Sequence, residues 1–323
     1  MRPSPGEPSE LLIGDFTMKC LVTGGSGFIG SHLVQKLLES DHEVAVLDLR
    51  QPFQDVEWLE LDIRDKEKIN LKGFQVVYHL AALSNARRSS ELPNVCYITN
   101  VLGTLNIVQA ALRDGVERVI LASSSWVAGA QCGDVINEKI PFNLLDVNTV
   151  YGASKLAQEM ICYSYLGEFG GPSFTVLRYG IPYGERMWRG LVVRAFMEMA
   201  ERTGTINIMG DGKQYREFLY VGDMCDGQVL ALAPIAENKV YNLTGDRPIT
   251  VEELAKEVAK YFPAELNYIP QARVEPKLKR IQNDLAKSEL GWNPSTTLAE
   301  GIQMCAEWWK SLSEEQKSEK YWI

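Results

Sequence analysis

A glycine-rich turn between an apolar run and a helical pattern constrains this chain more than any other feature. The run Cys20–Thr23 leads directly into GGSGFIG, and a helical pattern follows from Gly30 to Leu38. Glycines in such a turn let backbone N–H groups approach a pyrophosphate, and the N-terminus of the next helix adds a favourable dipole. The pattern therefore predicts a dinucleotide-binding turn, whose candidate contacts are Gly24, Gly27, Phe28, Ile29 and Gly30.

A carboxylate follows this turn at the spacing that a dinucleotide site requires. Asp48 closes the next apolar run, Val44–Leu47, about 20 residues after the glycines. A carboxylate there suits the two hydroxyls of a ribose and repels a 2′-phosphate, so the sequence favours NAD over NADP. Arg50, two residues further on, leaves NADP open as an alternative.

Short apolar runs alternate with helical patterns along the first half of the chain. This alternation predicts an α/β fold with a Rossmann-type, doubly wound parallel sheet. The expected strands are Cys20–Thr23, Val44–Leu47, Trp58–Leu61, Val76–Leu80, Val119–Ala122 and Thr175–Leu177, and the expected helices are Gly30–Leu38, Ile98–Leu112 and Tyr151–Phe169.

The alternation breaks after Arg178, where helical patterns over Leu191–Arg202 and Val251–Tyr261 are separated by loops that contain glycine and proline. We expect a smaller C-terminal substrate-binding lobe in this region. The predicted division is a flexible N-terminal extension over 1–17, an NAD-binding Rossmann domain over 18–180, and mainly the lobe over 181–323, with some segments returning to the Rossmann sheet.

The composition argues against several classes of function. The formal net charge of −9 over 323 residues argues against a nucleic-acid-binding surface, which needs a basic face. No apolar run approaches the length needed to cross a membrane. The three histidines fall in the first quarter and the six cysteines are scattered, so we expect no metal site and a cytoplasmic, reduced protein.

A tyrosine and a lysine four residues apart stand at the start of the third expected helix. Residues at this spacing share a helix face, so Lys155 is expected beside Tyr151. An ammonium and the positive charge of an oxidised nicotinamide both favour phenolate, and so lower the pKa of tyrosine from its ordinary value of about 10. Ser124 follows the fifth expected strand, where ligands of doubly wound sheets bind, and could polarise a substrate oxygen.

With these features in place, the chain resembles the extended short-chain dehydrogenase/reductases, and within them the NAD-dependent sugar epimerase/dehydratase group. The resemblance covers nearly everything after residue 18, through TGGSGFIGSHLV, LDIRD, HLAA, NVLGTLNIVQAA, YGASK, LRYGIPYG, GDGKQYREFLYVGDM, YNLTG and LGWNPSTTLAEGI. It implies NAD as cofactor, a nucleotide-sugar as substrate with UDP as the commonest carrier, and a homodimer formed through helices near 98–112 and 151–169.

The resemblance also implies roles for single residues. Tyr151 is implied as the catalytic base, Lys155 as its electrostatic partner and ribose contact, and Ser124 as the hydroxyl that orients the substrate. Further cofactor positions are Asp62 and Ile63 near the adenine, Ala81 in the cleft, Asn100 as a support and Pro182 near the nicotinamide. The implied substrate contacts are Ser124, Ser125, Trp126, Arg216 and Arg273, with the two arginines toward the diphosphate.

Members of this group begin by oxidising the sugar at its fourth carbon, and the next step distinguishes them. The 4,6-dehydratases carry an Asp-Glu pair just after the catalytic hydroxyl, where this chain has Ser125 and Trp126. Epimerisation beside the ketone needs an acid and a base, and only Cys132 is a candidate here. Turnover of the keto sugar needs neither, which favours a 4-epimerase. A dehydratase or related lyase is the alternative, and an NAD-binding regulatory protein without turnover is a third.

Four positions depart from the pattern of the group and are expected to reshape the substrate pocket. Ala128 stands where tyrosine is usual, Gly180 replaces a bulky residue, and Ile181 replaces an asparagine that commonly contacts the nucleotide-sugar. Trp188 adds a large aromatic side chain nearby. These departures leave the identity of the sugar open.

Overall fold

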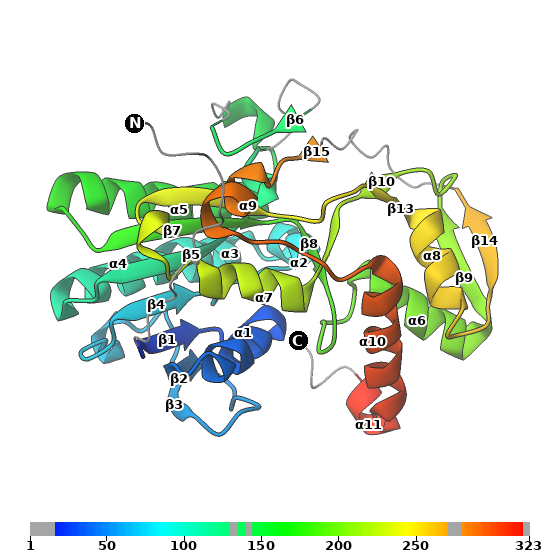
Figure 1. The fold of residues 1–323 in the computed structure, drawn as a ribbon, viewed down its shortest axis with the longest axis horizontal. Helices are drawn as coiled ribbons and strands as arrows, with labels where there is room; N and C mark the ends of the chain where they lie inside the picture. Colours follow the sequence, from blue (N-terminus) through cyan, green and yellow to red (C-terminus); the bar gives the residue numbers. More distant parts are fainter. Residues whose placement is uncertain (1–16, 129–134, 140–143, 271–279, 319–323) are drawn as a thin grey trace, which may run out of the picture.

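A seven-stranded parallel sheet forms the centre of the protein in the computed structural model, which describes residues 17–128, 135–139, 144–270 and 280–318. The strand order is β12-β7-β5-β4-β1-β2-β3, so the chain crosses over between neighbours and winds outward in both directions from β1 and β4 (Figure 1). The strands are β1 (Lys19–Thr23), β2 (Glu43–Asp48), β3 (Glu57–Glu60), β4 (Val76–His79), β5 (Arg118–Ser124), β7 (Ser173–Tyr179) and β12 (Lys239–Leu243). The predicted fold class is confirmed.

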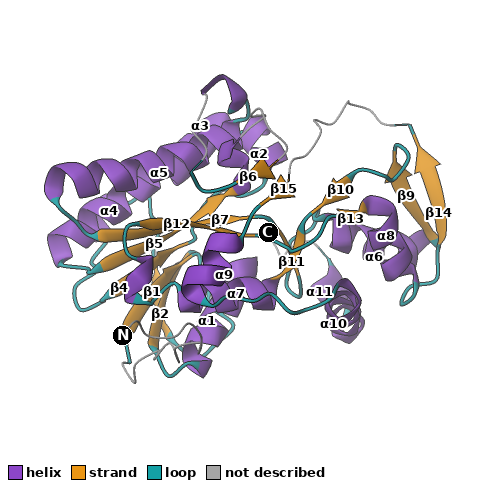
Figure 2. Ribbon diagram, turned by 45° about the horizontal axis from the view of Figure 1, so that its top comes forward, coloured by secondary structure: helices purple, strands orange, loops and turns teal. Residues whose placement is uncertain are grey.

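Helices cover both faces of this sheet, which explains why its central strands are continuous apolar runs. All seven residues of β5 are buried. Figure 2 shows α1 (Phe28–Glu39), α7 (Val221–Leu230) and α9 (Asp284–Leu290) on one face, and α4 (Gly103–Asp114) and α5 (Val150–Phe169) on the other. The segment that forms β12 comes from the region assigned to the lobe, and it pairs with β7 at the sheet edge.

The helix predicted over Ile98–Leu112 is one part of a longer helical stretch. It runs through α3 (Pro93–Tyr97), a π-helical turn η2 (Ile98–Leu102) and α4 without a break. A π-helical turn contains one residue more than an α-helical turn, and such turns are common at functional sites. The short helix α2 (Ala86–Glu91) precedes this stretch.

This helical stretch, Pro93–Asp114, is also long and apolar enough by composition to cross a membrane. The expectation that no apolar run approaches that length is therefore wrong. Half of its most apolar window is buried inside the fold. Its inner face contributes Ile107, Val108 and Ala111 to a core with β4 and β5, as expected for a helix that covers a sheet.

The remaining elements form a second group around a core of their own. That core is centred on Phe196, Ile208 and Trp309. The helices of this group are α6 (Val192–Thr203), α8 (Val251–Ala259), α10 (Leu298–Ser311) and α11 (Glu314–Lys317). Its paired strands are β9 (Thr205–Met209) with β14 (Glu265–Ile269), and β10 (Tyr215–Arg216) with β13 (Ile249–Thr250).

Two further strand pairs lie near the carboxyl edge of the large sheet (Figure 1). They are β8 (Ile181–Tyr183) with β11 (Phe218–Tyr220), and β6 (Val135–Ile136) with β15 (Arg280–Ile281). The short 3₁₀ turns are η1 (Lys66–Lys68), η3 (Ser125–Ala128), η4 (Leu144–Asp146) and η5 (Pro234–Ala236). The β8–β11 pair is parallel and joins the segment after β7 to the segment before α7.

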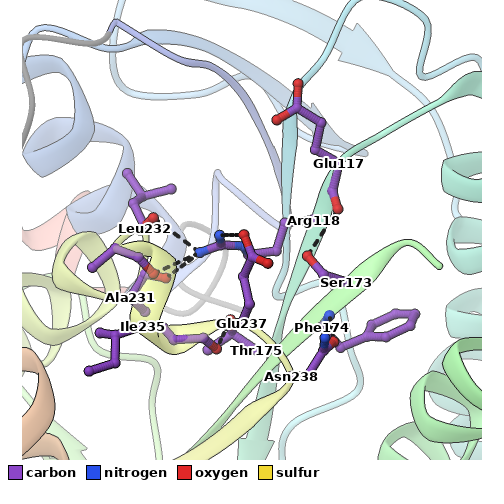
Figure 3. Close-up of polar contacts among 12 residues, drawn as sticks. Glu117, Arg118, Ser173, Phe174, Thr175, Ala231, Leu232, Ile235, Glu237 and Asn238 are labelled. Atoms are coloured by element: carbon purple, nitrogen blue, oxygen red, sulfur yellow. Dashed lines mark hydrogen bonds and ion pairs between the residues drawn. The ribbon is translucent and has the colours of Figure 1, made fainter. Parts of the chain in front are cut away.

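Arg118 ties the chain that follows α7 to the first residue of β5. Its Nη1 donates to the carbonyl oxygens of Ala231 (3.1 Å) and Leu232 (3.0 Å), and its Nη2 pairs with the carboxylate of Glu237 (Figure 3). A third carbonyl, that of Ala233, accepts from Nη1 at 3.1 Å. Carbonyls at a helix C-terminus lack partners within the helix, so the buried guanidinium satisfies them and fixes where the chain turns toward β12.

Replacing Arg118 with methionine should lower the free energy of unfolding by about 2–4 kcal/mol, because buried carbonyls lose a charged donor. Urea denaturation followed by circular dichroism measures this loss. The matched control is Arg87→Met, which removes an exposed i,i+4 ion pair with Glu91 and should cost under about 0.5 kcal/mol. Equal losses in the two variants would contradict the role assigned to Arg118.

Candidate active site

The predicted site residues gather at the carboxyl edge of the large sheet, where doubly wound folds bind their ligands. Gly24 follows β1, Asp48 ends β2, Ala81 follows β4 and Ser124 ends β5. Tyr151 and Lys155 lie in the first turns of α5, which begins at a cap in which the Thr149 side chain accepts from Gly152 N at 3.0 Å. The topology thus brings residues from five separate stretches of sequence to one edge.

Two glycines of the turn between β1 and α1 are required by close backbone contacts. A Cβ on Gly24, whose φ is +74°, would lie 2.7 Å from the backbone nitrogen of Ala81. A Cβ on Gly30 would lie 2.1 Å from the carbonyl oxygen of Gly24. The turn therefore packs directly on the end of β4, and the first turn of α1, which begins with Phe28 and Ile29, packs directly on the glycine turn.

Asp48 is fixed against this turn. Its Oδ2 accepts from the backbone N–H of Ser26 at 3.0 Å, and its Oδ1 accepts from that of Arg50 at 3.0 Å. Each carboxylate oxygen keeps a lone pair for a further donor. Asp48 can thus accept hydrogen bonds from two ribose hydroxyls, the role predicted for it. The guanidinium of Arg50 turns back to the carbonyl oxygen of Ser26 at 3.4 Å.

The two residues predicted near the adenine follow β3. Asp62 forms an ion pair with Arg64, whose Nε lies 2.9 Å from both carboxylate oxygens, and this hydrogen bond lowers the pKa of Asp62. Ile63 is buried, and its carbonyl oxygen accepts from Asn106 Nδ2 at 2.9 Å. The side chain of Ile63 lies against Gly103, where a Cβ would be 2.5 Å from its Cδ1.

Tyr151 and Ser124 share a hydrogen bond, and Lys155 lies one helical turn further along the same face of α5. Ser124 and Lys155 are both buried. The Lys155 ammonium donates to the carbonyl oxygen of Ala122 at 2.8 Å. The structure therefore brings the three predicted catalytic side chains together at the end of β5.

The ionisation of this group differs from the expectation. Burial raises the pKa of Tyr151 to about 12, and the hydrogen bond with Ser124 offsets only part of that rise. The Lys155 ammonium is directed to the backbone carbonyl oxygen of Ala122. Burial also lowers the pKa of Lys155, to about 8. Without bound ligands, the phenol is therefore protonated at neutral pH.

Asn100 supports the start of α5 from within the π-helical turn. Its Nδ2 donates to Ser154 Oγ at 2.9 Å, and Ser154 Oγ in turn donates to the carbonyl oxygen of Tyr151 at 2.8 Å. Its Oδ1 accepts from the backbone N–H of Leu83 at 2.7 Å. Cys96 Sγ also contacts Ser154 and Asn100. Neither Ser154 nor Cys96 was predicted from the sequence, although each lies at helical spacing, Ser154 from Tyr151 and Cys96 from Asn100.

A buried histidine continues this network to the glycine turn. His79 lies between Thr23 Oγ1 (2.8 Å) and Thr104 Oγ1 (2.9 Å), and Thr104 donates to the carbonyl oxygen of Asn100 at 2.5 Å. Burial lowers the pKa of His79 to about 3, so its imidazole is neutral. The described residues contain no group of three His, Cys, Asp or Glu side chains that could hold a metal ion.

The predicted substrate contacts lie on different elements. Ser125 and Trp126 begin the η3 turn directly after Ser124, and the indole of Trp126 lies edge-on to the Tyr151 ring at 6.1 Å between centroids. Trp126 is 46% exposed, and so presents apolar surface next to the Tyr151 phenol. Arg216 is half-buried on β10, and its Nη1 donates to the carbonyl oxygen of Tyr215. Arg273 and Cys132 lie outside the described residues.

The departures from the family pattern have partial structural explanations. Gly180 lies against Thr244, where a Cβ would be 2.5 Å from Oγ1, so Thr244 takes the space of the usual bulky residue. Ala128 is buried. Ile181 and Pro182 are half-buried on β8, and Trp188 is half-buried in the loop that follows.

A profile of the NAD dependent epimerase/dehydratase family matches residues 20–244. The chain belongs to this family. Among curated proteins it is similar to a putative UDP-glucose 4-epimerase of Methanocaldococcus jannaschii, 35% identical over 90% of this chain and 98% of that protein. It is also similar to UDP-glucuronic acid decarboxylase 1 of Danio rerio, 30% identical over 97% of this chain and 78% of that protein.

Solved structures give the same result for the fold and the cofactor. A UDP-glucose 4-epimerase of Thermotoga maritima with UDP-glucose has a TM-score of 0.82 at 31% identity, covering 91% of this chain and 99% of that one. A Thermus thermophilus UDP-glucose 4-epimerase with NAD has a TM-score of 0.80 at 29% identity, over 92% and 100%. A dTDP-glucose 4,6-dehydratase of Streptomyces venezuelae with NAD has a TM-score of 0.82 at 28% identity, over 91% and 97%. NAD as the cofactor is confirmed.

Gly30→Ala should abolish measurable NAD binding, because the added methyl group would collide with the carbonyl oxygen of Gly24 and displace the turn. Isothermal titration calorimetry with NAD measures the effect. The matched control is Gly167→Ala in α5, where an added Cβ meets nothing within 4 Å. That variant should bind NAD normally and gain up to about 1 kcal/mol of stability. Normal NAD binding by Gly30→Ala would show that the turn tolerates a side chain.

Proposed function

We propose that this chain is an NAD-dependent UDP-sugar 4-epimerase that acts through a transient 4-keto sugar. The observation that carries the proposal is the surroundings of the Tyr151 phenol. Ser124 shares a hydrogen bond with it, and the next two residues, Ser125 and Trp126, carry no acidic group. Dehydration needs an acid and a base beside the sugar, whereas turning the keto sugar over needs only the group that moves the proton of the 4-hydroxyl.

Each catalytic side chain has a distinct part in this proposal. NAD, when bound, supplies the reversible oxidation of the fourth carbon. Tyr151 accepts the proton of the 4-hydroxyl and later returns it, and Ser124 holds the same oxygen by a hydrogen bond. Because the phenol alone has a pKa of about 12, the positive charges near it must be assembled before it can act as a base. We assign this part to the Lys155 ammonium, which lies one helical turn along the same face of α5.

The similar proteins support a reaction of this kind, but they include a decarboxylase and a dehydratase as well as epimerases. The relatives named as UDP-glucose 4-epimerases favour epimerisation, whereas the decarboxylase and the dehydratase named above favour a lyase reaction. A decarboxylase or a dehydratase is therefore the second candidate. We prefer epimerisation because the chain has the indole of Trp126 where the dehydratases that it resembles carry an acid.

The direct test is product analysis of the purified protein with NAD and a panel of UDP-, dTDP- and GDP-sugars. Anion-exchange chromatography coupled to mass spectrometry reads both retention and mass. We expect a new peak of unchanged mass from a UDP-sugar, without accumulation of NADH. A product lighter by one water or by carbon dioxide would replace the proposal with a dehydratase or a decarboxylase. No product from any sugar would favour an NAD-binding role without turnover.

The control for this test is Tyr151→Phe. The variant keeps the ring and loses the hydroxyl, so turnover should fall by at least about a thousandfold while NAD binding is retained. Tyr163→Phe removes a hydroxyl from the same helix on a partly exposed face, and should keep full activity. Activity that survives in Tyr151→Phe would mean that another group is the base.

We also propose that the chain forms a homodimer through the outer faces of α3, η2, α4 and α5, which lie side by side in Figure 2. Large apolar side chains are exposed on both stretches: Leu92 directly before α3, Val95 on α3, and Ile98 and Leu102 on η2, with Met160, Tyr163 and Phe169 on α5. Exposed apolar side chains on neighbouring helices favour a protein interface there. A second copy of the chain would cover it by presenting the same two helices.

Met160→Glu should weaken the dimer about thirtyfold, since a carboxylate would be buried at the interface. Sedimentation velocity over a range of protein concentrations measures the dissociation constant. The control is Met209→Glu, which changes an equally exposed methionine on β9 and should leave the dimer unchanged. A monomeric wild-type protein, or equal effects of the two variants, would rule out this interface.

A further inference from the structure

Three residues on one face of α5 hold three consecutive residues at the end of β5. Tyr151 pairs with Ser124, Lys155 Nζ donates to the carbonyl oxygen of Ala122, and Glu159 Oε1 accepts from Ser123 Oγ at 2.5 Å. Positions 151, 155 and 159 are each one helical turn apart, so they form a single row. The catalytic pair occupies the first two places of this row, and the third place belongs to a residue that the proposed chemistry does not use.

Glu159 is buried, with 1% of its surface exposed, and is joined to a second strand. Its Oε1 accepts from Arg178 Nε at 3.0 Å, and its Oε2 accepts from Arg178 Nη2 at 2.7 Å. Arg178 lies on β7 directly opposite Ser123 in the register of the sheet. The Glu159 carboxylate therefore joins α5 to the adjacent strands β5 and β7. Its contact on β5 is Ser123, the residue directly before Ser124.

A buried ion pair is a poor way to stabilise a core. The desolvation of two charges offsets most of their attraction, and apolar residues of similar volume are often as stable or better. The bidentate geometry does fix the position of both partners within narrow limits. The location of this pair, one turn beyond Lys155 and one residue before Ser124, is where such a constraint would matter for catalysis.

We propose that Glu159 is a positioning residue for the active site: through Ser123 and Arg178 it sets the register of α5 on β5, and its negative charge supports the ammonium of Lys155. The inference rests on the proposed use of Tyr151 and Lys155. It predicts two separable effects of losing the charge, one on geometry and one on the ionisation of Lys155.

The groups that face Lys155 make the second effect specific. They are the Cys96 thiol on α3, the neutral imidazole of His79 on β4, and Glu159 on α5 itself. Burial lowers the pKa of Lys155 to about 8, and Cys96 and Glu159 both oppose that lowering. Lys155 is protonated below its pKa. Removing the charge of Glu159 therefore makes the ammonium lose its proton at a lower pH than in the wild-type protein.

The experiment compares Glu159→Gln with the wild-type protein as a function of pH, using two readouts. The first is kcat with the UDP-sugar identified by product analysis. The second is the Kd for NAD measured by calorimetry, which needs no turnover. The matched control is Glu237→Gln. It removes the acidic partner of Arg118, which lies at the opposite end of β5 from Ser123 and Ser124.

In Glu159→Gln we expect kcat to fall by roughly ten- to a hundredfold. We also expect the alkaline loss of both kcat and NAD affinity to move to lower pH. Glu237→Gln should match the wild-type protein in both profiles. If Glu159→Gln keeps kcat within twofold and both pH profiles unchanged, the inference is wrong.

A further measurement is needed if Glu159→Gln does not fold or if the wild-type protein turns over no sugar. If Glu159→Gln fails to fold, the double variant Glu159→Met with Arg178→Met removes both buried charges together and should fold. Low kcat and the same shift of the NAD profile in this double variant support positioning, whereas wild-type values would reduce the pair to a structural role. If the wild-type protein turns over no sugar, the proposed function fails, and the pH profile of NAD binding still decides the role of Glu159.

Discussion

The turn after β1 approaches the end of β4 so closely that backbone meets backbone, with no side chain between them. Gly24 lies against Ala81, and Gly30 lies against Gly24. This contact places the N-terminus of α1 at the carboxyl edge of the sheet, where its dipole and N–H groups serve an anionic ligand. It also fixes Asp48, because the backbone of the same turn donates to its carboxylate.

A chain of hydrogen bonds connects the glycine turn of the candidate site with Tyr151. It runs from Thr23 through His79 and Thr104 to Asn100, and from there through Ser154 to the backbone of Tyr151. Every member is buried or at the start of a helix, so the distances between the glycine turn and the phenol are set by the core. The two halves of the candidate site are therefore parts of one network.

The parts of this site that the sequence could predict are those encoded by local spacing. The glycines, Asp48 and the Tyr151–Lys155 pair each depend on residues close together in the chain. Properties that depend on burial were not predictable in this way. Burial raises the pKa of Tyr151, and local spacing could not indicate this effect because desolvation is set by tertiary packing.

Long-range pairing and small changes of helical period were equally invisible. Glu159 and Arg178 lie on different elements, and nothing in the intervening sequence indicates that they meet. The apolar periodicity over Ile98–Leu112 predicted a helix but not the π-helical turn within it. Arg273 and Cys132 lie outside the described residues, so their predicted roles stay predictions.

The π-helical turn around Asn100 has a consequence for how this helix tolerates change in length. One residue corresponds to about 100° of rotation in an α-helix. A π-helical turn covers nearly the same rotation as an α-helical turn with one residue more. Deleting a single residue from Ile98–Leu102 would therefore restore regular winding and leave α3 and α4 nearly in phase. It would also remove the local widening at Asn100, whose hydrogen bond to Ser154 we expect to be lost. The support for the start of α5 thus depends on one extra residue that the helices on either side do not need.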